Sequence, residues 1–400
     1  MTDRRERASY LGVGFLLGVL ATLTADRITS VLRATRAPIA SPARSSPRPG
    51  PGVPSAATSP GRPPATPPPS ASAGVEPEWT AEDDALPETL SLQHEQLWSK
   101  LRRFSRLGEA ELAEVVRIFQ ASRMLGQGNP KATTHPMTRA ECRALRARAH
   151  THPDQPAICG KPFMVPIYDR QAGETESDAR LCIDQFEFPD IPCEYPVTWV
   201  RGIEVARLCR AVGKRICDTH EWEGACAGSL RPVEHEYSFE QARRDMRFFF
   251  NQKRQIVWAY GPQKHHEKCG TGSRKGPKCD TISWKGCGSN TYPAGAFPEC
   301  VSPFGVYDQH GNAAEHMNLP LSLEQLASRG DQLGETEMKG SWFIFQSYEA
   351  HEDDCRWRAP DWHGTRVMDI DSHSNYHLGF RCCRDVVPLG QRKPGGEPPS

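Results

Sequence analysis

The sequence predicts an α+β fold that is irregular, rich in loops and held together by disulfides, with a helical segment before it. All 14 cysteines follow residue 141, so the first third of the chain has none. From Cys159 onward, apolar runs are short and turn residues are frequent, which is typical of short strands joined by loops. A convincing helical repeat spans 203–211, where Gly213 follows as a stop, and a shorter helix is expected at 220–226.

The composition argues against one class of partner and indicates a compartment. The chain carries 49 basic and 49 acidic side chains. Binding to nucleic acid favours a basic excess, so we do not expect that partner. Cysteines gathered in one region indicate disulfides in an oxidising space. Zinc binding, the alternative, favours close Cys-x-x-Cys pairs, which the sequence lacks. Segment 264–279, which mixes His, Cys and Lys, is therefore expected to be a disulfide-closed basic loop rather than a zinc site.

The N-terminal part contains an apolar run and a low-complexity segment. After a short tail at 1–9, the run at 10–25 falls just short of the roughly 20 residues that span a bilayer comfortably. It is also slightly long for the core of a signal peptide. We expect an uncleaved membrane anchor there, with a signal peptide as the alternative. Residues 26–76 are rich in Pro, Ala and Ser, so they bury too little apolar surface to order themselves and are expected to form a disordered linker.

Apolar side chains at three- and four-residue spacing predict a helical neck at 77–127, broken at Leu107-Gly108. Its apolar stripe, which begins at Leu92, is expected to dock on the main domain, although a partner helix is an alternative occupant. A cysteine-containing connection follows at 128–181, in which Cys142 and Cys159 are expected to bond each other. The main domain is expected at 182–385 and a disordered tail at 386–400.

Motifs of the main domain occur in an order that resembles the formylglycine-generating enzyme, or sulfatase-modifying factor, family. In chain order they are GKRICDTHEWE from Gly213, FGVYD from Phe304, GNAAE from Gly311, KGSW from Lys339, CRWR from Cys355 and LGFRC from Leu378. Each motif is weak alone, but the combination is specific. The resemblance implies a fold related to C-type lectin domains. It also implies two disulfides, which join Cys209 to Cys382 and Cys226 to Cys355.

The resemblance further implies a structural calcium site. In the family, the positions of Asp308 and Glu315 bind calcium through their side chains, and those of Gly311 and Ala313 through backbone carbonyls. Calcium is a hard ion that accepts such a mixture of oxygen ligands. The alternative is that Asp308 caps a turn and Glu315 pairs with an arginine. His316 stands where the family often has tryptophan, so the packing beside this site is expected to differ.

The sequence lacks the two cysteines on which the family's chemistry depends. Family members oxidise a cysteine of a sulfatase to formylglycine, using two cysteines just after the Gly-Ser step to hold copper. Here those positions fall near Ile344 and Glu349, and neither side chain offers the soft sulfur that Cu(I) requires. Copper is therefore not expected. Copper binding could be restored only if Cys355 or Cys383 were a free thiol. Stretch 349–354 is expected to be a solvated acidic loop, with a hard-metal or cation site as the alternative.

We therefore expect a protein that binds rather than catalyses, anchored in a membrane with its domain facing the periplasm or the cell exterior. Its partner is expected to be a peptide, a glycan or an envelope protein. The resemblance places the substrate groove at Ser341, Trp342, Tyr348 and Arg358. One alternative is a copper-dependent oxidase of a protein cysteine with relocated thiols. Another is a different metal-dependent oxidation, as in relatives that draw iron-binding histidines from an added helical domain; for that role the neck offers only His94 and the loop residue His135.

Overall fold

The computed structural model describes residues 77–279, 283–359 and 364–388, which all belong to one compact unit spanning residues 71–400. The expected tail, anchor and linker at 1–76 lie outside the described residues, as do residues 389–400. Within the described ranges, no helix is both long enough and apolar enough to cross a membrane.

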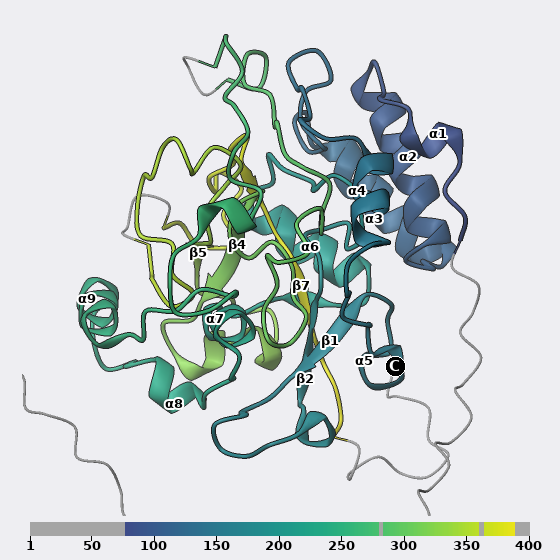
Figure 1. Ribbon diagram of the computed structural model, residues 1–400. Helices are drawn as coiled ribbons and strands as arrows, with labels where there is room; N and C mark the ends of the chain where they lie inside the picture. The colour runs from purple at the N-terminus through teal and green to yellow at the C-terminus, as the bar shows by residue number, and fades with distance from the viewer. Residues whose placement is uncertain (1–76, 280–282, 360–363, 389–400) are drawn as a thin grey trace, which may run out of the picture. The chain divides into compact units, whose positions relative to one another are not determined.

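Two small sheets lie at the centre of this unit (Figure 1). The first is antiparallel throughout and has the order β1 (Met164–Ile167), β2 (Leu181–Asp184), β7 (Cys382–Asp385) and β3 (Arg215–Ile216). In the second, β4 (Ala314–Leu319) lies antiparallel to β5 (Glu335–Lys339) and parallel to β6 (Leu378–Gly379). The LGFRC motif therefore contributes to both sheets, which brings motifs that are distant in the sequence together in space.

The predicted neck forms helices that pack against the main domain. These are α1 (Ala81–Asp84), α2 (Leu90–Arg103) and α3 (Glu109–Ala121), and α4 (Arg139–Arg146) follows them. The predicted break is confirmed, because Gly108 is the N-cap of α3 and its N–H donates to the Glu111 carboxylate. The apolar stripe joins the main core against α6, although Leu92 itself is 47% exposed. The apolar stripe of α2 and α3 therefore docks on the main domain, as expected.

A buried ion-pair cluster, formed by Lys100, Arg139 and Glu194, joins the neck and α4 to the main domain. Both Lys100 on α2 and Arg139 on α4 contact the carboxylate of Glu194, which is fully buried in the domain. The Arg139 guanidinium lies 2.7 Å from that carboxylate, and the Gln127 side-chain amide donates to it at the same distance. Burial alone would raise the pKa of Glu194, but the charges of Arg139 and Lys100 lower that pKa to about 2. Glu194 is therefore ionised at neutral pH.

The remaining helices are short. They are α5 (Pro156–Cys159), α6 (Gly202–Ala211), α7 (Thr219–Ala227), α8 (Val233–Glu236) and α9 (Arg243–Lys253), with 3₁₀ turns at Glu176–Asp178, His266–Lys268, Leu323–Gln325 and Ala327–Arg329. The helices predicted at 203–211 and 220–226 are confirmed as α6 and α7. Figure 1 shows α8 and α9 on the opposite side of the sheets from α1 to α4.

All 14 cysteines lie in the described ranges, and they form seven disulfides. The structure contains both bonds that the resemblance implies, Cys209–Cys382 and Cys226–Cys355. The others are Cys142–Cys193, Cys159–Cys182, Cys217–Cys383, Cys269–Cys300 and Cys279–Cys287. The bonds Cys269–Cys300 and Cys279–Cys287 link segment 264–279 to the residues that follow it.

The expected bond between Cys142 and Cys159 is wrong, because the two residues belong to different packing clusters. Cys142 lies on α4 and packs with Cys193 and Ala296. Cys159 ends α5, which packs beside β1, and its sulfur meets Cys182 of the neighbouring β2. Proximity in sequence was a poor guide here, since each helix covers a different part of the domain.

Candidate functional site

Ile344, near which the resemblance places the first copper position of the family, belongs to the apolar core. Ile344 is only 5% exposed and lies in a cluster with Trp342, Phe343 and Phe345. Both phenylalanines are fully buried. The Ser273 N–H donates to the Phe343 carbonyl at 2.7 Å, which ties this segment to the neighbouring loop. This position supplies packing and has no metal-binding atom.

Glu349, near which the resemblance places the second copper position, is an ion-pairing carboxylate. The Glu349 side chain is half exposed and lies 2.9 Å from the Lys264 ammonium. Its other oxygen lies 3.4 Å from Nδ1 of His266. Lys264 and His266 both belong to the basic segment 264–279, so the two segments that the sequence analysis treated separately meet here. The Glu349 carboxylate is thus held by a lysine and a histidine.

Asp353 connects this ion-pair cluster to the Gly-Ser step. It is buried, its Oδ1 accepts from the Trp258 indole at 3.0 Å, and its Oδ2 accepts from the Ser341 hydroxyl at 3.1 Å. His266 Nε2 lies 3.6 Å from the same Oδ2. Burial alone would raise the pKa of Asp353, but the interaction with His266, the hydrogen bond from Trp258 and the charge of Lys264 lower it below its usual range. Asp353 is therefore a fixed negative charge.

The expectation of a solvated acidic loop at 349–354 is wrong for its last two residues. Asp353 and Asp354 are 1% and 2% exposed. The Asp354 carboxylate pairs with Arg254, whose Nη2 lies 2.8 Å away. Because each charge has a cationic or hydrogen-bonding partner, the loop can bury both carboxylates.

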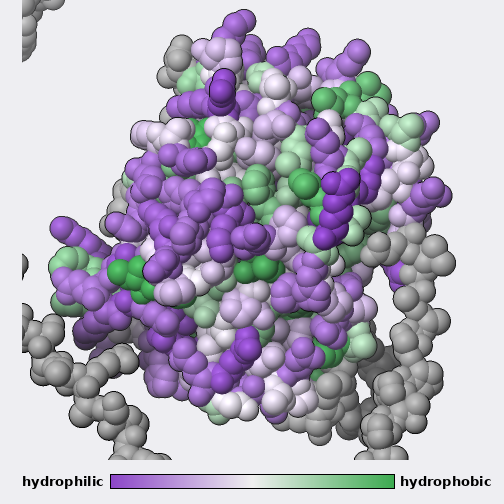
Figure 2. All heavy atoms as spheres, viewed as in Figure 1, coloured by the Kyte–Doolittle hydropathy of each residue, from purple (hydrophilic) through white to green (hydrophobic). Residues whose placement is uncertain are grey.

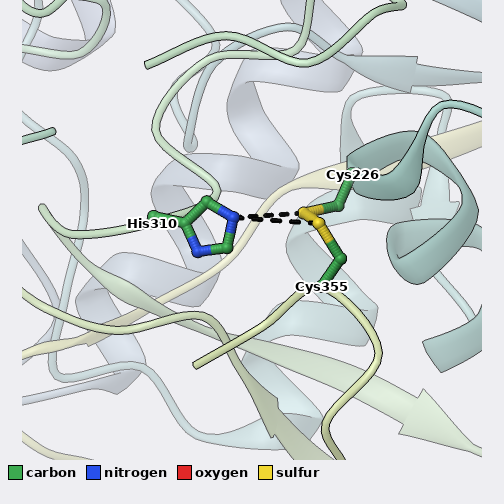
Figure 3. Close-up of side chains that lie close together, drawn as sticks. All are labelled: Cys226, His310 and Cys355. Atoms are coloured by element: carbon green, nitrogen blue, oxygen red, sulfur yellow. Dashed lines mark hydrogen bonds between the residues drawn. A yellow bond between two sulfur atoms is a disulfide. The ribbon is translucent and has the colours of Figure 1, made fainter. Parts of the chain in front are cut away.

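A buried histidine lies against one of the disulfides (Figure 3). His310 Nε2 is 3.3 Å from Sγ of Cys226 and 3.8 Å from Sγ of Cys355. It also accepts a hydrogen bond from the Ala259 N–H at 3.0 Å, so this nitrogen carries no proton. Burial lowers the pKa of His310 to about 4, which keeps the imidazole neutral at physiological pH. The three side chains would form a soft metal-binding set only if the disulfide were reduced.

The region of the expected calcium site is an unusually acidic interior. The Asp308 carboxylate accepts from the Gly295 N–H at 2.5 Å. Both oxygens of Glu315 lie 2.7 Å from the Arg381 guanidinium, and the Trp222 indole donates to one of them. Pairing of Glu315 with an arginine, the alternative that we kept open, is thus present. Gly311 has a φ of +76°, and a Cβ there would lie 2.8 Å from the Gly270 backbone, so this turn requires glycine.

A third carboxylate, Glu187, lies in the same interior and was missed by the sequence analysis. It accepts from the Asn312 amide at 2.7 Å and from the Ala313 N–H at 2.8 Å. Burial and the charges of Asp308 and Glu315 raise the pKa of Glu187 well above its usual range. Burial likewise raises the pKa of Asp308 to about 6. An available signal was that Glu187 is a single acid inside the apolar run FEFP.

These residues fit a hard cation. Three buried carboxyl groups lie near the buried Arg381 guanidinium, and Arg146 also acts on Asp308. The raised pKa values of Glu187 and Asp308 show that these positive charges do not compensate the burial, so a divalent ion would stabilise the ionised carboxylates. The resemblance implies that Asp308 and the carbonyls of Gly311 and Ala313 would hold it. Glu315 is oriented by Arg381, and Glu187 contributes charge while it fixes the backbone at Ala313.

Comparison with known proteins agrees with the motifs. Residues 170–386 match the sequence profile of the family described as "Sulfatase-modifying factor enzyme 1-like domain". The chain belongs to this family. No curated protein shows significant similarity to it. Among solved structures, one similar chain is PvdO from Pseudomonas aeruginosa, which is 15% identical, with a TM-score of 0.28 over 56% of this chain and 91% of PvdO.

In this sulfatase-modifying-factor domain, most of the expected groove residues are buried. Ser341 and Arg358 are fully buried and Trp342 is 4% exposed, whereas Tyr348 is 60% exposed. Ser341 accepts from the Gly311 N–H, Arg358 pairs with Glu223, and Trp342 stacks on His377. Only Tyr348 of the four presents a large surface to a partner.

His94 and His135 are the residues of this chain that the sequence offers for an iron site like that of some relatives. In the structure, each imidazole is hydrogen-bonded to a backbone carbonyl. His94 is buried, and its Nε2 donates to the Leu125 carbonyl at 2.7 Å. His135 stacks on Tyr195 with ring centroids 3.5 Å apart, and its Nδ1 donates to the Thr291 carbonyl. Burial lowers the pKa of His135 to about 3. Each ring therefore has one nitrogen occupied by a backbone carbonyl.

Proposed function

We propose that this protein is a binding member of the sulfatase-modifying-factor family that does not carry out copper-dependent oxidation. The observation that supports it best is the state of the cysteines: all 14 are in disulfides. The two positions that hold copper in relatives are a core isoleucine, Ile344, and an ion-paired glutamate, Glu349. Cu(I) depends on thiolates, and this chain offers none in its oxidised form.

The rigid surroundings of Glu349 favour a structural role for the former catalytic region. Lys264, His266 and Asp353 link the loop after the Gly-Ser step to the loop 264–268 through ion pairs and hydrogen bonds. In an oxidase, the same region would have to admit oxygen and a substrate cysteine. Here Phe343, Ile344 and Phe345 fill it.

Calcium is the cofactor that we propose for this domain. Asp308, with the carbonyls of Gly311 and Ala313, would hold it, and Glu187 would supply further negative charge. The ion would neutralise an acidic interior that connects β2 to β4, so its role would be to stabilise the fold. We further propose that the domain, which has the disulfides of an extracellular or periplasmic protein, is anchored to a membrane through residues 10–25.

The activity itself can be tested on a peptide. The full chain is incubated with a sulfatase-derived peptide that contains the target cysteine, with copper, oxygen and a thiol reductant, and the peptide is analysed by mass spectrometry. A family member that has both copper cysteines serves as the positive control. We expect the cysteine to remain unmodified. Conversion to formylglycine above the rate without protein would overturn the proposal.

One observation favours a second candidate, an oxidase that is switched on by reduction. The ligand atoms of Cys226, Cys355 and His310 lie within 4.8 Å of one another. Two electrons and two protons from a dithiol would convert the disulfide into two thiols, which with the imidazole form a set suited to Cu(I). This candidate predicts copper uptake after reduction that is lost in Cys226→Ser but retained in a chain in which only the Cys279–Cys287 pair is removed. Equal uptake in the two variants would exclude it.

A further inference from the structure

Helix α9 turns two of its arginines, Arg243 and Arg247, towards the domain and two of its phenylalanines, Phe248 and Phe249, outward. Arg247 is 5% exposed and faces Glu337, and Arg243 pairs with Glu335. By contrast, Phe248 and Phe249 are 57% and 46% exposed. Figure 2 shows hydrophobic side chains bordered by hydrophilic ones on the side where Figure 1 places α9. Burying arginine while exposing phenylalanine is unfavourable for a helix that only covers a core, so this outer face is suited to an apolar ligand.

A basic pocket adjoins this aromatic face. It lies between α8 and α9 and has a volume of about 460 Å³. Met246, Phe249 and Phe250 form its apolar wall. Its cationic side chains are Arg231, Lys253, Arg254 and Arg356. The pocket therefore combines positive charge with aromatic surface.

The cations of the pocket exceed its anions. Glu236 is the carboxylate that lines it, and Arg356 neutralises this residue at 2.7 Å. Arg254 is paired with Asp354. Lys253 has no ion-pair partner in the described part of the chain, and the contacts of the Arg231 guanidinium are long, at 3.9 Å to Glu236 and 3.4 Å to the Gln255 side chain. These two side chains are therefore available to an anion.

A buried donor at the same place also lacks a partner. Arg356 is 1% exposed, and its Nε makes no hydrogen bond to any described residue. A buried guanidinium N–H without an acceptor is costly, and Arg356 lines the pocket in which an acidic ligand would bind. The surplus charge and the open donor thus point to the same kind of ligand.

We propose that the α8–α9 pocket binds the acidic headgroup of an anionic phospholipid, with Phe248 and Phe249 contacting its acyl chains. Arg231 and Lys253 would hold the phosphate by charge-assisted hydrogen bonds. A free inorganic anion would use the cations but not the exposed aromatic pair, which is why an amphiphile fits better. Ile256, which is 57% exposed, extends the apolar surface beyond the end of α9. The inference goes beyond the proposed function, because it requires neither the presence nor the absence of copper chemistry.

The test uses the full chain and dihexanoylphosphatidylglycerol below its micelle concentration, followed by isothermal titration calorimetry. We expect saturable binding with one lipid per chain. The zwitterionic analogue dihexanoylphosphatidylcholine should bind at least tenfold more weakly. The double variant Arg231→Gln, Lys253→Gln should lose at least tenfold in affinity, since it removes two charged hydrogen-bond donors. Phe249→Ser should weaken lipid binding severalfold and leave the affinity for inorganic phosphate unchanged.

The matched control removes the same charge elsewhere. Arg123 and Arg148 are exposed and lie outside the pocket, so Arg123→Gln, Arg148→Gln should bind the lipid as the unmodified chain does. Melting temperatures establish that all variants are folded. Several results would overturn the inference: no saturable lipid binding, equal affinity for both lipids, binding of inorganic phosphate alone, or equal losses in the pocket and control variants. None of these measurements involves thiols or copper, so their failure would leave the proposed function standing.

Discussion

Replacement of Glu194 by glutamine should detach the neck from the domain. The substitution keeps the size of the side chain but removes the carboxylate that pairs with both Lys100 and Arg139, which are buried. Removing one partner of a buried ion pair costs about 3–5 kcal/mol, because the remaining charges stay desolvated. The pKa gives a similar magnitude: the shift of Glu194 from 4.5 to about 2 corresponds to about 3 kcal/mol of stability.

The assay is urea unfolding at pH 7, followed by tryptophan fluorescence. Glu194→Gln should lower the free energy of unfolding by about 3 kcal/mol. The matched control is Glu109→Gln in the exposed pair with Arg102, whose side chains are 53% and 82% exposed for Arg102 and Glu109. That change should cost about 1 kcal/mol or less. If Glu194→Gln lowered the free energy of unfolding no more than the control did, the ion pairs of Glu194 with Lys100 and Arg139 would not stabilise the fold.

The same residue predicts a pH dependence. The pKa of Glu194 is depressed in the folded state, so its contribution is present above about pH 4.5 and is lost as pH falls towards 2. Unfolding free energies measured between these limits should fall less steeply for Glu194→Gln than for the unmodified chain. Identical slopes would show that Glu194 is not the residue that titrates.

Three shorter predictions concern the domain interior. Asp308→Asn should abolish the calcium-dependent rise in melting temperature, and an unchanged calcium response in that variant would refute the site. The double variant Ile344→Cys, Glu349→Cys should gain stoichiometric Cu(I) binding in competition with a chelator. If the variant folds with two new free thiols and takes up no copper, the resemblance misplaces the copper-binding positions of the family. Asp353→Asn should destabilise the domain by about 3 kcal/mol in urea unfolding, because the buried charge holds Trp258, Ser341 and His266 together, and a loss below about 1 kcal/mol would contradict this role.

The sequence predicted those parts of the fold that leave a local or family-wide pattern. The helices at 203–211 and 220–226 and the break at Leu107-Gly108 follow from apolar spacing and glycine. The bonds of Cys209 and Cys226 to partners more than 100 residues away followed from the resemblance, because chain spacing carries no information about such contacts.

Features that depend on tertiary packing were not predictable in the same way. Cys142 pairs with Cys193 because α4 packs beside that residue, and nothing local indicates this. Asp353 looked like a solvated acid, yet the side chains of Ser341 and of Trp258, which is 95 residues away, donate hydrogen bonds to it in the interior. The sequence also did not indicate that Arg243 and Arg247 of α9 point inward, because their carboxylate partners lie on β5, far along the chain.

The most direct test of the account is a Cu(I) titration of the folded chain with its disulfides intact, against a competing chelator and with a thiol count on the same sample. The account predicts no reactive thiol and no copper taken from the chelator, because all 14 cysteines are in disulfides and we propose that Ile344 and Glu349 stand at the copper positions of relatives. One equivalent of tightly held Cu(I) that is released when thiols are alkylated would contradict it.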